Sequence, residues 1–360
     1  MQAFISKAPI VDEEWDNFLK NQPTGHHVQG SAWGVLKATG GMDIIRVIVR
    51  ENEEIIGGAQ ILSRPLPVFG EIGYISRGPV IKEGRIDVLD FLFDAIEKTA
   101  KQNRLIVLSI GLPVSDQPHM NQLSKRNFMP SDFYIIPPTT VLVSLDGEEE
   151  EILMRMKSRT RRNVRKGLKS DLVVREGRDE DIPLIFSWME EAAKQDPYYY
   201  YNLEYYHKAM EILGEANILK LFVADFEGTP VSGAYVAALG DWAVFKWGAS
   251  SGEHLDKRPN ELIHWHAIKW SKSFGCKYYD LGGITPLVAE ALNNGNDLPD
   301  IKGSGIAHFK LGFGEKHNFP DAYDTSYSML PNWFVRGVVK YVWDNQFLRN
   351  LARKVLNPGP

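Results

Sequence analysis

The segment FKLGF holds the residue best suited to acyl chemistry. Lys310 stands between Phe309 and Phe313, close to Gly312 and Gly314. An ammonium framed by aromatic rings in a partly dry site can stabilise an oxyanion, because a low dielectric strengthens the attraction. We therefore predict that Lys310, with Phe309 beside it, is catalytic. The alternative is a lysine that lies along an aromatic surface with its ammonium in water.

The segment KYYDLGG supplies a carboxylate at the end of a predicted strand. Asp280 could accept a proton from an attacking amine, which is nearly all ammonium at neutral pH if its pKa is ~10.4. It could also position that amine or cap the loop. His308 is a further candidate for moving a proton. Cys276, the single cysteine, lies where a helix runs into a strand, so we do not expect it to be catalytic, and no Cys and His spacing predicts a metal site.

A dense run of cations lies within residues 155–169, although the chain carries a formal net charge of -5. On a helix its eight basic residues form two stripes, which are Lys157, Arg161, Arg165 and Lys169, and Arg155, Arg159, Arg162 and Lys166. A mostly apolar seam runs between them: Leu153, Met156, Thr160, Val164 and Leu168. Guanidinium groups match phosphate oxygens, so the run predicts a polyanion partner. The alternative is a solvated charged face.

This basic helix is expected to begin near Asp146, an N-cap with Glu149 three residues on in a capping-box pattern. Acidic residues 148–151 suit the positive end of the helix dipole, and the basic residues lie in the later turns, where cations are favoured. Ordinary helix chemistry therefore explains part of the charge pattern.

Length and composition limit the class of protein. The 360 residues predict two domains, and the 44% hydrophobic content supplies a core. The mild overall acidity argues against a general nucleic-acid binder, so a polyanion must be bound locally. Residues 1–20 lack the pattern of a secretory signal, and no stretch reaches the ~18 apolar residues of a spanning helix. We expect a cytoplasmic monomer, with the inner face of the membrane as an alternative location.

The same order of predicted elements occurs twice: a strand pair, a strand, a helix and a strand. The first copy comprises residues 44–66, 73–80, 87–102 and 105–111, and the second comprises 218–240, 242–251, 259–274 and 277–283. This order matches the GNAT acyltransferase fold, whose mixed sheet opens to admit an acyl donor. We predict an α/β (α+β) protein of tandem GNAT-like units with mixed sheets and a cleft between them. The first unit is residues 1–145, joined by a C-terminal helix within 331–360, and the second is residues 146–330.

The segments that would bind acetyl-coenzyme A do not fit that cofactor. A standard enzyme of this fold has a glycine-containing loop whose N–H groups hold the pyrophosphate. The corresponding segments, residues 76–87 and 250–262, read SRGPVIKEGRID and SSGEHLDKRPNEL. We therefore expect no cofactor and a different activated acyl donor.

Five segments resemble, in this order, the Fem family of FemA, FemB and FemX aminoacyltransferases. They are QGSAWGVLKATGG (29–41), YISRGPV (74–80), MKSRTRRNVRKGLKS (156–170), YYDLGGI (278–284) and HFKLGFG (308–314). The resemblance covers about residues 25–330 and favours the compact FemX type, because a coiled-coil arm is lacking. It implies transfer of an amino acid from aminoacyl-tRNA to an amine on the stem peptide of a peptidoglycan precursor, UDP-linked or lipid-linked, without a metal.

The resemblance also implies roles for individual residues. Lys310 would act at the reacting ester, and Lys37 would bind the phosphates of the acceptor, although alone it would read as a helix-surface lysine. Tyr205, Tyr206 and Arg77 complete the substrate-binding set. The predicted tRNA contacts are Arg159, Arg162, Arg165 and Lys166.

One position departs from the family pattern. An arginine that contacts precursor phosphate precedes the paired tyrosines by four positions, and here that position is Tyr201. Two alternatives therefore stay open: an N-acyltransferase that modifies a protein or small-metabolite amine, and a non-catalytic tRNA- or envelope-associated binding protein. The segment 332–355 is predicted to be one helix, which packs on the first domain or lies on an anionic membrane.

Overall fold

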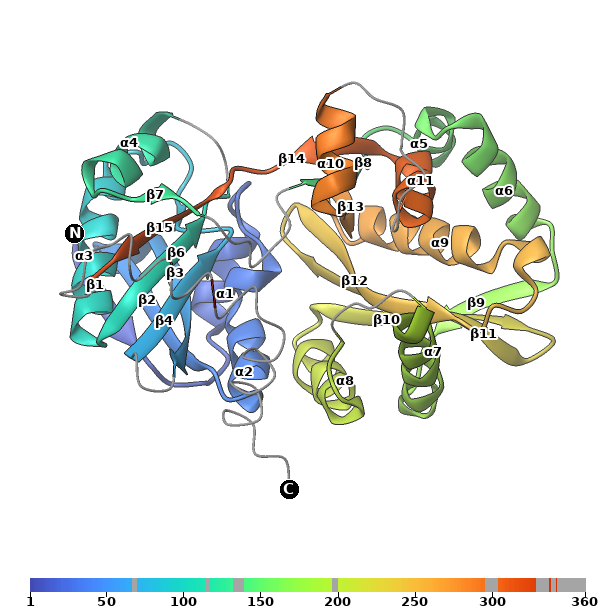
Figure 1. The fold of residues 1–360 in the computed structure, drawn as a ribbon, viewed down its shortest axis with the longest axis horizontal. Helices are drawn as coiled ribbons and strands as arrows, with labels where there is room; N and C mark the ends of the chain where they lie inside the picture. Colours follow the sequence, from blue (N-terminus) through green and yellow to red (C-terminus); the bar gives the residue numbers. More distant parts are fainter. Residues whose placement is uncertain are drawn as a thin grey trace. The chain divides into compact units, whose positions relative to one another are not determined.

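The computed structural model describes residues 1–66, 70–113, 117–131, 139–195, 200–294 and 304–327, together with Gly337 and Tyr341. The chain divides into two compact units (Figure 1). Unit 1 comprises Met1–Pro138 and Phe319–Pro360, and unit 2 comprises Thr139–Asn318. The predicted helix at 332–355 lies outside the described residues apart from Gly337 and Tyr341.

The unit boundaries differ from the predicted ones at residues 145 and 330. Strand β8 (Thr139–Ser144) pairs with strands of unit 2, so the second unit begins before residue 145. Strand β15 (Ala322–Ser326) pairs with strands of unit 1, so that unit resumes before residue 330. Both shifts have one cause, which is that a strand belongs to the sheet whose hydrogen bonds it completes.

Unit 1 is built on one mixed sheet in the order β1-β2-β3-β4-β6-β15-β7, with β5 paired to β3. Its other strands are β1 (Gln2–Ser6), β2 (Asp43–Glu51), β3 (Glu54–Leu66), β4 (Gly70–Ser76), β5 (Val80–Ile81), β6 (Leu105–Gly111) and β7 (Met129–Pro130). Its helices are α1 (Glu13–Lys20), the 3-10 helix η1 (His27–Gln29), α2 (Ser31–Thr39), α3 (Val88–Gln102) and α4 (Gln117–Lys125). Strands β4 and β6 are parallel.

The alternation of side chains in β2 explains how this sheet is covered. Ile45, Val47 and Val49 belong to a core that also contains Phe93 of α3. Arg46 lies between two of these residues and therefore points to the opposite face. There its guanidinium donates hydrogen bonds to backbone carbonyls of residues 8 and 10. The sheet is thus buried on both faces.

Unit 2 has a second mixed sheet, in the order β14-β8-β13-β12-β11-β10-β9. Its strands besides β8 are β9 (Leu172–Glu176), β10 (Leu219–Phe226), β11 (Thr229–Leu239), β12 (Trp242–Ser250), β13 (Tyr278–Gly283) and β14 (Glu315–Asn318). Its longer helices are α5 (Glu149–Arg155), α6 (Ser158–Leu168), α7 (Ile182–Gln195), α8 (Leu203–Ala209), α9 (Pro259–Ser273), α10 (Pro286–Asn293) and α11 (Ser304–Phe313). Short helical turns are η2 (Asp179–Asp181), η3 (Met210–Gly214) and η4 (Leu255–Lys257).

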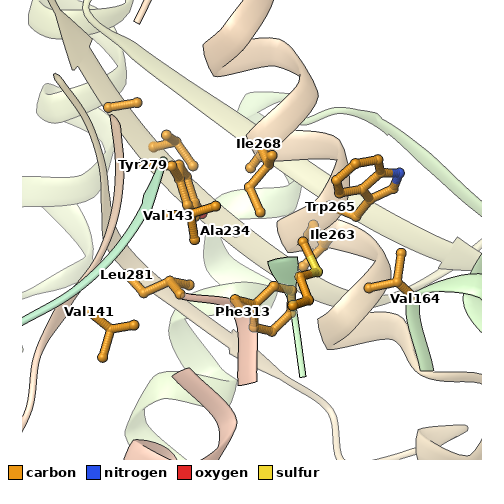
Figure 2. Close-up of a cluster of buried hydrophobic side chains, with 14 of the residues drawn as sticks. Val141, Val143, Val164, Ala234, Ile263, Trp265, Ile268, Tyr279, Leu281 and Phe313 are labelled. Carbon is orange, nitrogen blue, oxygen red and sulfur yellow. The ribbon is translucent and has the colours of Figure 1, made fainter. Parts of the chain in front are cut away.

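The core of unit 2 lies between this sheet and the helices α6, α9 and α11, while α7 and α8 cover the other face (Figure 1). Figure 2 shows Val164 of α6, Ile263 of α9 and Phe313 of α11 gathered with Tyr279 and Leu281 of β13. The core therefore joins the basic helix to the helix that carries Lys310.

Both copies of the predicted order are confirmed, as β2, β3, β4, α3 and β6 and as β10, β11, β12, α9 and β13. The parallel strands of the two copies differ in the length of their pairing. Strand β4 pairs with β6 as far as Ser76 and Gly111. Strand β12 pairs with β13 only as far as Val244 and Asp280, and residues 245–250 and 281–283 are not paired with each other. The second sheet therefore opens after Asp280.

The predicted basic helix is in fact two helices. Helix α5 has Glu148 as its N-cap, in a capping box with Glu151, so the prediction of an Asp146 and Glu149 box was wrong. The helix ends at Arg155, and α6 begins at Ser158. The break has a tertiary cause, because the backbone N–H of Lys157 donates to the carbonyl of residue 312 in α11 at 2.9 Å.

Candidate active site

Lys310 lies on α11, with its ammonium at the opening of the second sheet. Its Nζ donates a hydrogen bond to the carbonyl oxygen of Gly283 at 2.8 Å. A Cβ placed on Gly282 would lie 3.6 Å from this Nζ and 3.6 Å from the carbonyl oxygen of Phe245. The ammonium therefore stands where β12 and β13 have separated.

The surroundings of Lys310 determine its protonation. Phe309 and Phe313 flank it on the helix, with ring centroids 5.2 Å apart. Burial lowers the pKa of Lys310 to about 8, and the charge of Asp280 opposes that effect. Lys310 is thus mostly an ammonium at pH 7, which is the form that oxyanion stabilisation requires.

Asp280 holds the loop that receives Lys310. The carboxylate is 6% exposed, and its Oδ1 accepts hydrogen bonds from the N–H of Gly282 at 2.7 Å and from the hydroxyl of Thr140 in β8. Gly282 has a φ of +83°, a left-handed conformation that favours glycine. Among the roles predicted for Asp280, these contacts favour the holding of the loop, because they fix the turn that presents the Gly283 carbonyl.

Sequence reasoning missed His264 on α9. Its Nδ1 lies 2.9 Å from the hydroxyl of Tyr279, and its ring centroid lies 5.6 Å from those of Phe309 and Phe313. Burial and the charge of Lys310 lower the pKa of His264 to about 3, and burial raises the pKa of Tyr279 well above its ordinary value. Both groups therefore stay neutral beside Lys310. No local pattern could reveal His264, because only tertiary packing brings α9 against α11.

Helix α6 lies directly against this site. Thr160 and Val164 of the predicted seam are buried, whereas Leu168 is 45% exposed and does not belong to it. A Cβ placed on Gly312 would come within 2.0 Å of the Thr160 hydroxyl oxygen, so only glycine permits this approach of α11 to α6. Asn163 donates a hydrogen bond to Glu261 in the first turn of α9 at 2.8 Å.

The cations of α5 and α6 separate into engaged and unengaged groups. Arg155 and Arg161 donate to backbone carbonyls at the ends of β8 and α5, and Arg165 forms an ion pair with Glu150. The other predicted tRNA contacts, which are Arg159, Arg162 and Lys166, are exposed. Within the described ranges these three have no hydrogen-bond or ion-pair partner. Among the predicted tRNA contacts, these three have charge to offer a ligand.

The predicted substrate tyrosines lie in an aromatic cluster. Tyr205 is 6% exposed and Tyr206 is 1% exposed, and both rings pack against Trp247. Tyr201, at the position where an arginine was expected, stacks on Tyr205 with centroids 3.7 Å apart and planes 12° apart. The burial of Tyr206 argues against direct contact with a substrate. Tyr201 presents a ring instead of a charge.

Two predicted substrate residues belong to unit 1. Lys37 on α2 is 8% exposed, with its Nζ 4.5 Å from the ring centroid of Trp33, so it is not a simple surface lysine. Arg77 directly follows β4, and its guanidinium lies 3.2 Å from the ring centroid of Phe319. Arg77 has a φ of +53°, which is uncommon for a residue other than glycine.

The remaining candidate residues are less well placed for catalysis. His308 is exposed on α11. Burial raises the pKa of Cys276 to about 12, so its thiol stays protonated. Within the part of the chain that the structure describes, no group of His, Cys, Asp and Glu side chains could hold a metal ion. Among those same residues, no helix has the length and apolar character needed to cross a membrane.

Two family models match this chain. One, described as the FemAB family, matches residues 10–122, and the other, described as an acetyltransferase (GNAT) domain, matches residues 154–294. Similar curated proteins include the lipid II:glycine glycyltransferase of Staphylococcus epidermidis, 22% identical over 351 residues, and that of Staphylococcus haemolyticus, 23% identical over 354 residues. In both cases the match covers 78% of this chain and 84% of the relative.

Solved structures show the same fold. The crystal structure of FemX superimposes with a TM-score of 0.81 at 20% identity, over 94% of this chain and all of that one. L-PGS from Bacillus licheniformis gives a TM-score of 0.56 at 11% identity, over 95% of this chain and 99% of that one. The tandem GNAT-like architecture predicted from the repeated order of elements is therefore confirmed.

Proposed function

We propose that this chain, which belongs to the FemAB family, is an aminoacyltransferase that moves an amino acid from aminoacyl-tRNA to an amine of a peptidoglycan precursor. The observation that carries the proposal is the ammonium of Lys310, held by the Gly283 carbonyl at the opening of the second sheet. The names of the relatives support lipid II, a lipid-linked muramyl peptide, as the acceptor. A cytoplasmic monomer that works at the inner face of the membrane fits such an acceptor.

The reaction needs little more than alignment and charge stabilisation. The neutral acceptor amine attacks the carbonyl carbon of the aminoacyl ester, and a C–N bond forms as the carbonyl oxygen becomes an oxyanion. One N–H of Lys310 is taken by Gly283, so two remain to stabilise that oxyanion. The intermediate then expels the ribose oxygen, which leaves as a hydroxyl with a proton that the amine gives up. Because the ester is already activated, positioning supplies much of the acceleration.

The first turn of α9 supports a donor other than acetyl-coenzyme A. In this fold a pyrophosphate would occupy the N-terminus of that helix. Here α6 covers it, because Asn163 bonds to Glu261, and a Cβ placed on Gly167 would lie 3.0 Å from the Cβ of Leu262. The carboxylate of Glu261 would also repel a pyrophosphate. We therefore include no cofactor in the reaction.

One observation favours a second candidate function. The ring of Tyr201 occupies the position expected for a phosphate-binding arginine. A tyrosine cannot neutralise a diphosphate, so an acceptor amine on a different molecule, such as a protein or small metabolite, is the second candidate.

A transfer assay separates these functions. Purified protein is mixed with tRNA charged with labelled glycine, alanine or serine and with either lipid-linked or UDP-linked muramyl pentapeptide. We expect label to move from the tRNA into a precursor. Release of label to water alone, or transfer to neither precursor with any of the three amino acids, would reject the proposed acceptor. Transfer to another amine would support the second candidate.

A further inference from the structure

A buried hydrogen-bonded pair, His264 and Tyr279, lies beside Lys310 and has no part in the reaction described above. The side chain of His264 is 6% exposed, that of Tyr279 is 0% exposed, and the His264 Nδ1 lies 2.9 Å from the Tyr279 hydroxyl oxygen. Burial, together with the charge of Lys310, lowers the pKa of His264 to about 3, and burial raises the pKa of Tyr279 well above its ordinary value. The pair therefore consists of two neutral polar groups close to the candidate catalytic cation.

The imidazole of His264 lies among the elements that form the opening of the second sheet. Its ring centroid is 4.8 Å from that of Phe245, the first residue of β12 beyond the last paired step with β13. The centroids of Phe309 and Phe313 on α11 are each 5.6 Å away. Tyr279 belongs to the part of β13 that is still paired with β12. His264 is therefore placed where the two strands begin to separate, against the helix that carries the catalytic lysine.

The hydrogen bonds of the pair indicate which nitrogen of His264 carries the hydrogen. A neutral imidazole has one donor and one acceptor nitrogen. If Nδ1 were the donor, the hydroxyl hydrogen of the buried Tyr279 would have no acceptor among the described residues, which is costly. If the Tyr279 hydroxyl donates to Nδ1, that hydrogen is satisfied and Nε2 carries the N–H. Within the described ranges this Nε2 has no hydrogen-bond partner, and it is not fully buried.

We infer that the Nε2–H of His264 is a second, neutral hydrogen-bond donor to the carbonyl oxygen of the aminoacyl ester, and that Tyr279 positions it. This inference rests on the proposed function. As the carbonyl oxygen becomes an oxyanion, its bonds to Lys310 and to His264 both strengthen. A neutral donor suits this place, because a second cation would lower the pKa of Lys310 further. The imidazole keeps its proton throughout, and the proton from the amine still leaves with the ribose oxygen.

The first test is the rate of single-turnover transfer by variants of the pair. His264→Phe keeps an aromatic ring but removes the donor, so the rate should fall by about 10- to 100-fold. Tyr279→Phe frees the imidazole to change its tautomer and should lower the rate by a smaller factor. The double variant should match His264→Phe, because Tyr279 acts only through His264. His266→Phe removes a partly buried imidazole from the same helix and, as the matched control, should leave the rate unchanged.

Thermal stability distinguishes this role from simple packing. His264→Phe leaves the buried Tyr279 hydroxyl without a partner, so it should lower the Tm. The double variant with Tyr279→Phe removes both polar groups and should recover most of that loss, whereas the rate of transfer should not recover. Recovery of both quantities would assign the pair to packing and overturn the inference. Equal rates in wild type and His264→Phe would also overturn it.

Nitrogen-15 NMR of histidine-labelled protein measures the tautomer without any substrate. The signals that disappear in His264→Phe identify this residue among the nine histidines. At pH 7 we expect a neutral ring with its hydrogen on Nε2, and a mixture of tautomers in Tyr279→Phe. A hydrogen on Nδ1 would overturn the inference, because Nε2 could not then donate.

The transfer assay also separates this inference from the proposed function. A wild-type protein that transfers nothing would reject the proposed function. An active wild type with an equally active His264→Phe would reject only the role of His264.

Discussion

The two units share an order of elements but differ at their parallel strands. In unit 1, β4 and β6 stay paired to Ser76 and Gly111. In unit 2, β12 and β13 separate after Val244 and Asp280, and the ammonium of Lys310 stands between the separated segments. The same local pattern therefore produces a closed sheet in one copy and an open sheet with a cation in the other. The candidate catalytic lysine therefore lies where the second sheet opens, and the repeated order of elements alone does not specify that position.

The largest expected effect is the loss of kcat on replacing Lys310 of unit 2, compared with replacing a lysine of unit 1. Lys310→Ala removes the ammonium that stabilises the oxyanion, so kcat for transfer should fall by about 10²- to 10³-fold, while tRNA affinity stays unchanged. Lys125→Ala removes an exposed lysine of unit 1 that pairs with Asp90 and should leave kcat unchanged. Single-turnover transfer and tRNA binding measure both quantities. Equal kcat in wild type and Lys310→Ala would show that Lys310 takes no part in the chemical step.

The contact between α6 and α11 should show the next largest effect. Gly312→Ala places a Cβ 2.0 Å from the Thr160 hydroxyl oxygen, so it should lower the free energy of unfolding by about 1 to 3 kcal/mol. Gly305→Ala, on the same helix, meets open space and should cause no such loss. Urea denaturation compares the two variants. The double variant Gly312→Ala, Thr160→Ala should recover stability, and a failure to recover would contradict the contact.

The left-handed turn beside Lys310 offers a more local test. Gly282→Ala and Gly228→Ala replace glycines with φ of +83° and +80°, so each should lose about 1 kcal/mol of stability. Nothing lies within 4 Å of a Cβ on Gly228, whereas one on Gly282 adjoins the Lys310 Nζ. Only Gly282→Ala should therefore lower kcat, by about tenfold. Equal kcat in the two variants would show that the conformation of this turn does not affect catalysis.

The smallest expected effect is a shift in pH dependence. Lys310 must be an ammonium, so kcat should fall as pH rises through about 8. Burial lowers the pKa of Lys310, and the Asp280 carboxylate raises it. Asp280→Asn removes the raising charge, so the proton leaves at lower pH and the falling limb should move to lower pH. Thr140→Ser keeps the hydroxyl bonded to Asp280 and should leave the limb in place.

Sequence reasoning succeeds here where the causes are local. The strand pairs predicted at residues 44–66 and 218–240 depend on patterns within a few residues, and the structure has them as β2 with β3 and β10 with β11. The repeated order then predicts both GNAT-like units.

The remaining features depend on contacts between distant segments. Lys310 meets Gly283, Thr140 holds Asp280, and His264 packs against α11, although these residues come from four different elements. The break between α5 and α6 likewise follows from the bond of Lys157 to residue 312. No periodicity records such contacts, and for the same reason the predicted unit boundaries were displaced.

The close approach of Thr160 to Gly312 has a consequence for natural variation. Helix α6 and helix α11 lie about 150 residues apart in the chain, and the space at residue 312 has no room for a methyl group unless residue 160 becomes smaller. In proteins that keep this packing, a residue larger than glycine at the position of 312 should occur together with glycine, alanine or serine at the position of 160. The two positions should therefore change together through evolution, as a record of the contact between the basic helix and the helix of Lys310.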